Sequence, residues 1–271
     1  MGSRDVPPDG LALFAEELRA AREKAGLSRE ELAARLNYSA SLITKIEGMS
    51  RVPQADLAIG CDRVFSTPGT FGRIQRRVQT LSFPASYRPF VEHEAKAASL
   101  RTFEHSLIPG LLQTPEYARA VLATRPNASE EEIEDLVAAR LARQAILGRD
   151  DPPLLWAVMD EAVLHRPIGD AKIMHDQLVH LAGTAGRPNV TVQVIPYSAG
   201  AHSGLLGAFT VADSDGKAGS VYLESPADGQ TIEEPSMVAK VALVFDTLRS
   251  EALPRGASAD LIMKVAEEEW T

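Results

Sequence analysis

The sequence has almost none of the features that secreted, disulfide-linked or membrane-spanning proteins need. Its 271 residues include a single cysteine, Cys61, so no disulfide framework can form. It also has no run of about 18 apolar residues, which predicts that no segment crosses a membrane. Residues 1–10, MGSRDVPPDG, are polar and rich in proline and glycine, so we expect a disordered lead and no signal peptide. These absences together predict a cytoplasmic protein.

An excess of positive charge is also missing, because the formal net charge is -9. The charge is unevenly distributed along the chain. Residues 1–80 hold 12 Lys and Arg against 10 Asp and Glu, a net of +2. The remainder holds 28 − 12 = 16 basic and 37 − 10 = 27 acidic residues, a net of -11. The first part can therefore approach a phosphate backbone, whereas the second suits a basic partner or simply keeps the protein soluble.

Motifs for catalysis or metal binding are absent. His175 and His180 share a predicted helix, but they are five residues apart, whereas zinc pairs on a helix are about three or four apart. Asp160, Glu161 and His165 follow a predicted strand and could serve acid–base chemistry, although a surface ion pair explains them more simply. The segment HSGLLG lacks the spacing of a nucleophile elbow. We therefore expect no enzyme activity, no cofactor and no metal.

Residues 27–53, LSREELAARLNYSASLITKIEGMSRVP, have the pattern of two short helices separated by a tight break. A preceding helix is predicted from about residue 11 to 24, closed by Gly26. Ser28 and Glu31 form the capping-box pattern at the start of the next helix. Asn37 tolerates the left-handed conformation that a sharp turn requires. The following helix is capped by Ser39, and a further helix restarts after Pro53.

A helix, a three-residue turn and a second helix, flanked by supporting helices, form the helix-turn-helix arrangement. In that arrangement the second helix lies in the DNA major groove, and residues near its N-terminus contact base edges. The predicted base-contacting residues are Ser39, Ala40, Ser41, Thr44 and Lys45. Arg29 and Arg51 are placed to contact phosphates, which positions a protein without reading sequence. A helical bundle that binds protein is the alternative interpretation.

This stretch resembles the Cro/C1-type repressors, also called the xenobiotic-response-element family. The chain keeps the family's S-x-E-E-L-A and S-x-S-x-I-T-K-I-E-G patterns and the proline that follows. It departs from the family at Arg29, where glutamine is usual, and at Asn37, where glycine is usual. Ala40 also lacks the glutamine often found at the first exposed position of the reading helix. These departures from the family pattern predict sparse base readout, with a contribution from DNA shape.

A linker is predicted at residues 73–84, after a DNA-binding domain at 11–72 and before an α+β domain at 85–271. The linker region carries Arg73, Arg76 and Arg77, which could contact phosphate or form a solvated helix face. In the second domain, NVTVQVIP, GAFTVAD and GSVYLES have the β-branched content of strands, and several amphipathic segments predict helices. We expect an all-α N-terminal domain followed by an α+β domain with a small, largely antiparallel sheet.

The loop PYSAGAHSGLLGAF in the second domain is a candidate binding surface for a partner or ligand. Its candidate residues are His202, Leu205, Leu206 and Phe209. A second possibility is a small-molecule pocket between sheet and helices, which would make the chain a ligand-sensing regulator. The aromatic residues that could line such a pocket, or simply form core, are Trp156, Tyr197, Phe209 and Tyr222.

Three segments of the second domain, SLRTFEHSLIPGLLQTPEYARAVL, IPYSAGAHSGLLGAFTVAD and GSVYLESPADG, resemble the C-terminal domain of a group of actinobacterial regulators. The group includes WhiJ-type developmental regulators and antitoxin-like transcriptional regulators. The resemblance implies a repressor, nucleoid-associated in the cytoplasm, that binds double-stranded DNA. It also implies a small partner protein encoded by the adjacent gene. One helix-turn-helix contacts little DNA, so a homodimer is expected, with half-sites about one helical turn apart.

Overall fold

The chain forms two compact units. The computed structural model describes residues 8–81, 83, 86–214, 217–225 and 229–271. The first unit comprises Met1–Ala85 together with Pro126–Ala142, and the second comprises Ser86–Arg125 and Arg143–Thr271. The α+β domain predicted at residues 85–271 is therefore not continuous, because residues 126–142 group with the first unit. Residues 1–7 of the predicted disordered lead lie outside the described residues.

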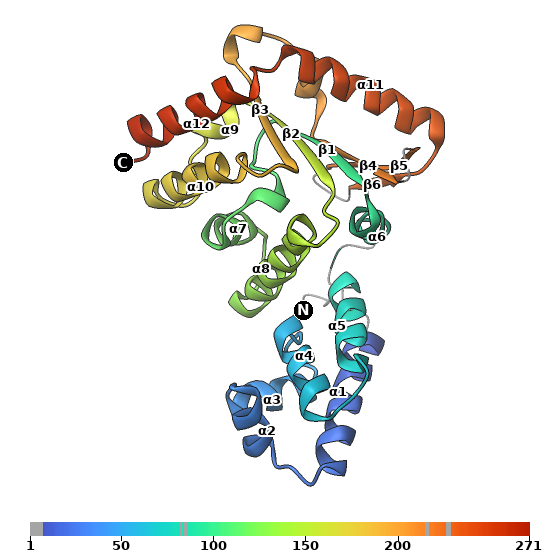
Figure 1. Ribbon diagram of the computed structural model, residues 1–271. Coiled ribbons are helices and arrows are strands. Elements are labelled where there is room, and N and C mark those ends of the chain that lie inside the picture. The colour runs from blue at the N-terminus through green and yellow to red at the C-terminus, as the bar shows by residue number, and fades with distance from the viewer. Residues whose placement is uncertain (1–7, 82, 84–85, 215–216, 226–228) are drawn as a thin grey trace. The chain divides into compact units, whose positions relative to one another are not determined.

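The first unit is helical (Figure 1). Its helices are α1 (Pro8–Lys24), α2 (Arg29–Leu36), α3 (Ala40–Glu47), α4 (Ala55–Val64), α5 (Thr70–Leu81) and most of α8 (Glu130–Gln144). Helix α1 begins three residues before the predicted start, inside the region expected to be disordered. Most of the predicted linker, residues 73–81, is helical and forms part of α5. Ser66, Pro68 and Gly69 lie in the short segment that separates α4 from α5.

Apolar side chains from α1 to α5 meet in one core. The fully buried members include Phe14 and Leu18 of α1, Leu32 of α2, and Ile43 of α3. Phe71 of α5 packs edge-on against Phe14, with ring centroids 5.5 Å apart. Because α5 supplies a fully buried aromatic residue to this core, the helix is an integral part of the unit and not a spacer.

The second unit contains one sheet and helices on both of its faces (Figure 1). Its strands are β1 (Ser99–Glu104), β2 (Leu154–Asp160), β3 (Val190–Ile195), β4 (Phe209–Ser214), β5 (Lys217–Leu223) and β6 (Gln230–Ile232). Its helices are α6 (Arg88–Lys96), α7 (Pro115–Leu122), α9 (Ala162–His165), α10 (Ala171–Thr184), α11 (Pro235–Glu251) and α12 (Arg255–Glu269). Short 3-10 turns occur at Gly110–Leu112, Ala145–Gly148, Tyr197–Ala199 and Ser203–Leu206.

The sheet is mixed, with six strands in the order β3-β2-β1-β4-β5-β6. Strands β1, β2 and β3 pair in parallel, while β1 with β4, β4 with β5, and β5 with β6 pair antiparallel. The α+β prediction is confirmed in outline, but the expected small, largely antiparallel sheet is wrong. Helices separate β1 from β2 and β2 from β3 along the chain, and such crossovers bring the strands back in parallel.

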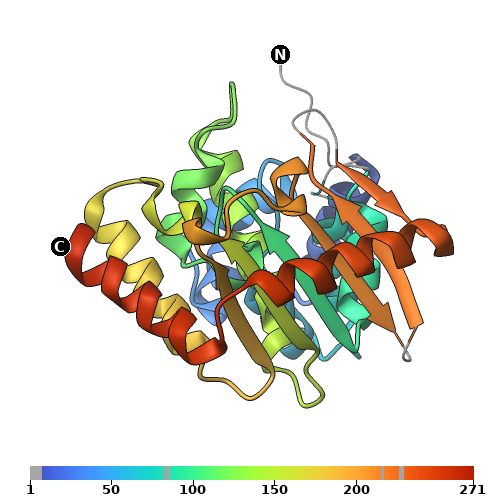
Figure 2. The ribbon, with the colours of Figure 1, turned by 90° about the horizontal axis from the view of Figure 1, so that it is seen from above.

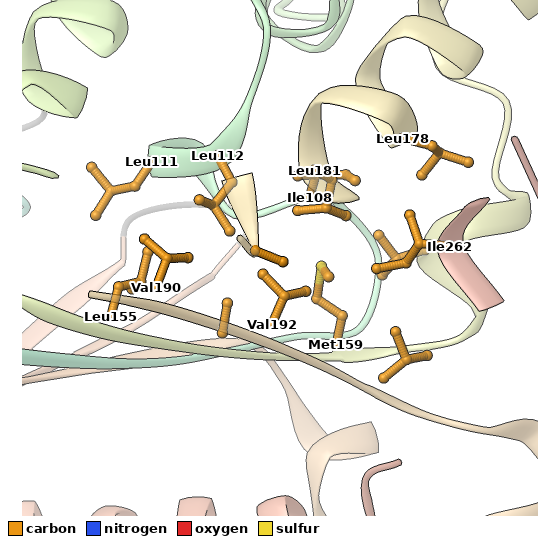
Figure 3. Close-up of a cluster of buried hydrophobic side chains, with 14 of the residues drawn as sticks. Ile108, Leu111, Leu112, Leu155, Met159, Leu178, Leu181, Val190, Val192 and Ile262 are labelled. Carbon is orange, nitrogen blue, oxygen red and sulfur yellow. The ribbon is translucent and has the colours of Figure 1, made fainter. Parts of the chain in front are cut away.

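Each face of the sheet is covered by its own apolar core. On one face, β-strand residues such as Leu155, Met159 and Val192 face Leu178 of α10 and Ile262 of α12 (Figure 3). On the other face, helix α11 lies across the strands (Figure 2) and buries Val238, Phe245 and Leu248 against the sheet. The sheet is therefore a buried middle layer. None of the helices within the described part of the chain combines the length and apolar character needed to span a bilayer.

Candidate DNA-binding surface

The junction between α2 and α3 is a tight turn built as the sequence predicts. Ser28 caps α2: its Oγ accepts from the backbone NH of Glu31 at 3.1 Å, and the Glu31 carboxylate accepts from the Ser28 NH at 2.7 Å. Asn37 ends α2 with φ 60° and ψ 43°, in the left-handed region. Ser39 then caps α3, since its Oγ accepts from Leu42 NH at 3.2 Å. Both helices are therefore fixed by local hydrogen bonds.

Helix α3 has one buried and one exposed face. Ile43 and Ile46 are buried in the core of the unit, and Ser41, Thr44 and Lys45 are exposed. The Thr44 hydroxyl donates to the carbonyl of Ala40 at 3.0 Å, so only its lone pairs are available to a ligand. The Ser41 hydroxyl makes no hydrogen bond within the described residues, which leaves both its donor and its acceptor capacity for a base edge.

The remaining two predicted base-contacting residues have fewer groups available to hydrogen-bond with a base. Ala40 is half-buried and packs against the core of the unit. Ser39 is exposed, but its oxygen already caps α3 and only its hydroxyl proton can be donated elsewhere. The five residues thus extend from the N-cap of α3 to its last turn, and Ser41 retains the most hydrogen-bonding capacity for a base edge.

Arg29, predicted to contact phosphate, is partly engaged inside the unit. Its Nε donates to Glu47 Oε2 at 2.8 Å. Glu47 is fully buried and also receives Arg22 Nε at 2.6 Å and Nη2 at 3.2 Å. Burial alone would raise the pKa of Glu47, but the hydrogen bonds from Arg22 and Arg29 outweigh it and hold that pKa below its ordinary value. Arg29 therefore ties the start of α2 to the end of α3.

Lys45 and Arg51 are both paired with the first two turns of α8. Lys45 Nζ lies 2.9 Å from Glu131 Oε1. Arg51 Nε lies 3.1 Å from Asp135 Oδ1, and its Nη1 donates to the backbone carbonyl of Glu131 at 3.1 Å. The Arg51 and Asp135 side chains are only 15% and 18% exposed, whereas Lys45 and Glu131 are about half exposed. The two cations expected to reach DNA thus contact carboxylates in this structure.

Three carboxylates at this surface were not expected from the sequence: Glu47, Glu131 and Asp135. Glu47 carries a local signal, because it follows Ile43 by four residues and so shares the buried face of α3. Glu131 and Asp135 carry no signal that relates them to α3, because the Ser129–Glu132 capping box fixes only the start of their own helix. Nothing local to residues 130–135 indicates that this helix packs with residues 45–51.

The arginines expected in the linker instead lie on α5. Arg76 and Arg77 are exposed, and Arg73 Nη1 donates to the carbonyl of Pro68 at 2.6 Å. The start of α5 is held by Asp62, whose carboxylate accepts from the NH groups of Phe71 and Gly72 at 3.0 and 2.9 Å. The exposed arginines therefore lie on a helix face, one of the two interpretations that the sequence allowed.

The loop predicted as a partner or ligand surface divides into buried and exposed residues. His202 and Phe209 are buried, so neither is available to a partner in this structure. Leu206 is 95% exposed and Leu205 is 55% exposed. Gly204 lies so close to the Phe103 ring that a Cβ at position 204 would fall 2.2 Å from it. The loop is thus anchored on the sheet at His202 and Gly204, and it presents its two leucines outward.

Polar side chains gather beyond the carboxyl ends of β2 and β3. His202 Nε2 lies 2.9 Å from Asp160 Oδ2, and His165 Nδ1 lies 2.8 Å from Glu269 Oε2. Glu161, the third residue considered for acid–base chemistry, accepts from the backbone NH of Tyr197 at 2.6 Å. Asp160 and Glu161 thus hydrogen-bond to the segment 197–202, and His165 connects α9 to the end of α12.

The aromatic residues suggested for a ligand pocket do not converge. Phe209 and Tyr222 are buried in cores on opposite faces of the sheet. Trp156 packs against the α11 side, and Tyr197 is 60% exposed beside His165. Phe209 and Tyr222 are therefore core residues, which is the second of the two roles that the sequence allowed.

Comparison with known proteins gives two family matches. Residues 13–70 match a helix-turn-helix domain, and residues 87–264 match the domain of unknown function DUF5753. No curated protein and no solved structure matches the chain significantly. The helix-turn-helix match indicates a DNA-binding regulator, and it spans the residues that form α2, the turn and α3.

Proposed function

Because the chain belongs to the DUF5753 family and carries a helix-turn-helix domain ahead of it, we propose that it is a sequence-specific regulator of transcription, a dimeric repressor controlled through its second unit. The observation that carries the DNA-binding role is the exposed face of α3. It places Ser41 and Lys45 opposite the buried Ile43 and Ile46, on a helix held rigidly by the Asn37 turn and the Ser39 cap. A short, polar and rigid helix face is what base readout in a major groove requires.

Base readout is tested at Ser41. Duplexes selected from a random library by the full-length chain define its preferred sequence, and affinities are then measured for each single-base change. Ser41→Ala should relax discrimination by about 1 to 3 kcal/mol at one position and leave the others unchanged. Ser50→Ala is the control, since Ser50 follows α3 and its hydroxyl donates to the Lys45 carbonyl. A uniform loss at all positions, or no change at any, would contradict a base contact by Ser41.

The second unit is the proposed site of a small protein partner. Two observations support this role. Leu205 and Leu206 form an exposed apolar pair. The second unit carries a net charge of -7, which is the -11 of residues 81–271 without the -4 of residues 126–142, and this charge favours a basic partner. In this proposal the chain has no catalytic step. It forms a homodimer whose two α3 helices reach half-sites about one helical turn apart.

Partner binding is tested by co-purification with the product of the adjacent gene, with light scattering of the complex. The wild-type chain should appear as twice 29.2 kDa plus the partner. Leu206→Glu should lose the partner and retain the dimer and DNA affinity, because the side chain is exposed and supports no core. Leu243→Glu, on exposed α11, is the matched control. A 29.2 kDa species, or a partner retained by Leu206→Glu, would contradict these assignments.

A further inference from the structure

The carboxylates of α8 are arranged against α3 as phosphates of DNA would be. The first turn of α8 consists of Glu130, Glu131 and Glu132, followed one turn later by Asp135. The Glu131 carboxylate forms an ion pair with Lys45. Arg51 forms an ion pair with Asp135 and donates a hydrogen bond to the Glu131 carbonyl. Oxygen acceptors spaced along α8 thus satisfy the same two cations that the helix-turn-helix offers to a duplex.

From this contact we propose that the segment 126–142 is an intramolecular inhibitor of DNA binding, and that DNA and α8 compete for Lys45 and Arg51. The inference rests on the proposed DNA-binding function. It goes beyond it, because a helix-turn-helix regulator needs no such segment in order to bind DNA.

Two physical effects make the two states mutually exclusive. Lys45 cannot direct its ammonium group at a phosphate while it lies 2.9 Å from Glu131, and the Arg51 guanidinium is already used by a carboxylate and a carbonyl. The acidic first turn of α8 would also repel the phosphates of an approaching duplex. Binding DNA therefore requires the first two turns of α8 to leave α3. The apparent dissociation constant is then the intrinsic constant divided by the fraction of molecules in which α8 is undocked.

Helix α8 also supplies a route for control. Its last residues, Arg143 and Gln144, belong to the second unit, where Arg143 forms a bidentate pair with Glu94 at 2.7 Å. The Glu94 and Arg143 side chains are only 4% and 14% exposed, so the end of the helix is firmly held there. A partner or signal that changes the second unit is thereby linked through one continuous helix to the cations of the DNA-binding unit.

The test is the affinity of the full-length double variant Glu131→Gln/Asp135→Asn for a selected duplex of about 30 base pairs. The variant keeps side-chain shape and removes both ion pairs, so it should bind about tenfold more tightly than the wild type. The control is Glu130→Gln/Asp150→Asn, which changes the net charge equally. Both control residues are exposed, and within the described residues neither carboxylate forms an ion pair. The control should bind as the wild type does, or slightly more tightly.

A second measurement uses the unmodified protein. Amide hydrogen exchange of residues 130–137 should become faster when the wild type is saturated with the same duplex, because the first turns of α8 lose their contacts with α3. Equal affinities of the double variant and its control, or unchanged exchange in the saturated complex, would overturn the inference and leave the proposed function intact. If neither the wild type nor any variant binds selected DNA, the proposed function fails, and the inference fails with it.

Discussion

At the scale of single residues, Glu47 shows how one buried carboxylate organises the DNA-binding unit. It joins Arg22 of α1 and Arg29 of α2 to the end of α3, and its backbone carbonyl also accepts from Arg19 at 3.1 Å. Its pKa is held below the ordinary 4.5 because the arginine hydrogen bonds outweigh the effect of burial. Removal of one partner from an ion pair that is buried this completely strongly destabilises a fold, because the remaining charge is left buried without compensation.

Glu47→Gln should lower the free energy of unfolding by about 3 kcal/mol at pH 7, measured by urea denaturation. A carboxylate whose pKa is lower in the folded than in the unfolded protein stabilises the fold fully at pH values above its unfolded-state pKa. That stabilisation is lost as the pH falls through its folded-state pKa. The difference between wild type and Glu47→Gln should therefore shrink below pH 4.5. Glu30→Gln, an exposed site on α2, is the control. A constant difference from neutral to acidic pH would show that Glu47 contributes through packing alone.

At the scale of elements, the α2–α3 junction was predictable because its determinants are local. Ser28, Asn37 and Ser39 each act within a few residues along the chain, so their roles can be read from spacing. The sheet was less predictable. Four of its strands, β2 to β5, were expected from their residues, but the parallel pairing of β1, β2 and β3 depends on partners more than 30 residues apart. The strand-helix-strand alternation was the signal that would have indicated it.

The Asn37 turn gives an element-scale prediction. Asn37→Gly should preserve stability and DNA affinity, because glycine adopts the left-handed conformation without steric cost. Asn37→Val should cost about 2 kcal/mol in free energy of unfolding, because a β-branched residue is disfavoured at φ 60°. Urea denaturation of the two variants measures the difference. Equal stability of the two variants would mean that the turn does not hold this conformation in solution.

At the scale of the whole molecule, the difference in net charge between residues 1–80 and 81–271 could be counted from the sequence. The unit to which residues 126–142 belong could not be predicted from it. The sequence places residues 126–142 in the middle of an acidic region, whereas the structure assigns them to the DNA-binding unit. That assignment depends on long-range pairs such as Arg51 with Asp135, more than 80 residues apart, and no local pattern encodes them. The candidate base-contacting residues could be named from sequence, and the carboxylates that pair with Lys45 and Arg51 could not.

The most direct test of a DNA-binding α3 is the salt dependence of duplex affinity. Lys45→Ala and Arg51→Ala are compared in the Glu131→Gln/Asp135→Asn background, where loss of the α8 ion pairs cannot contribute. Each should reduce the slope of log affinity against log salt by about 0.9, because one phosphate contact is lost. Lys264→Ala on α12 is the control and should keep the parental slope. Parental slopes for both Lys45→Ala and Arg51→Ala would contradict the placement of DNA against α3.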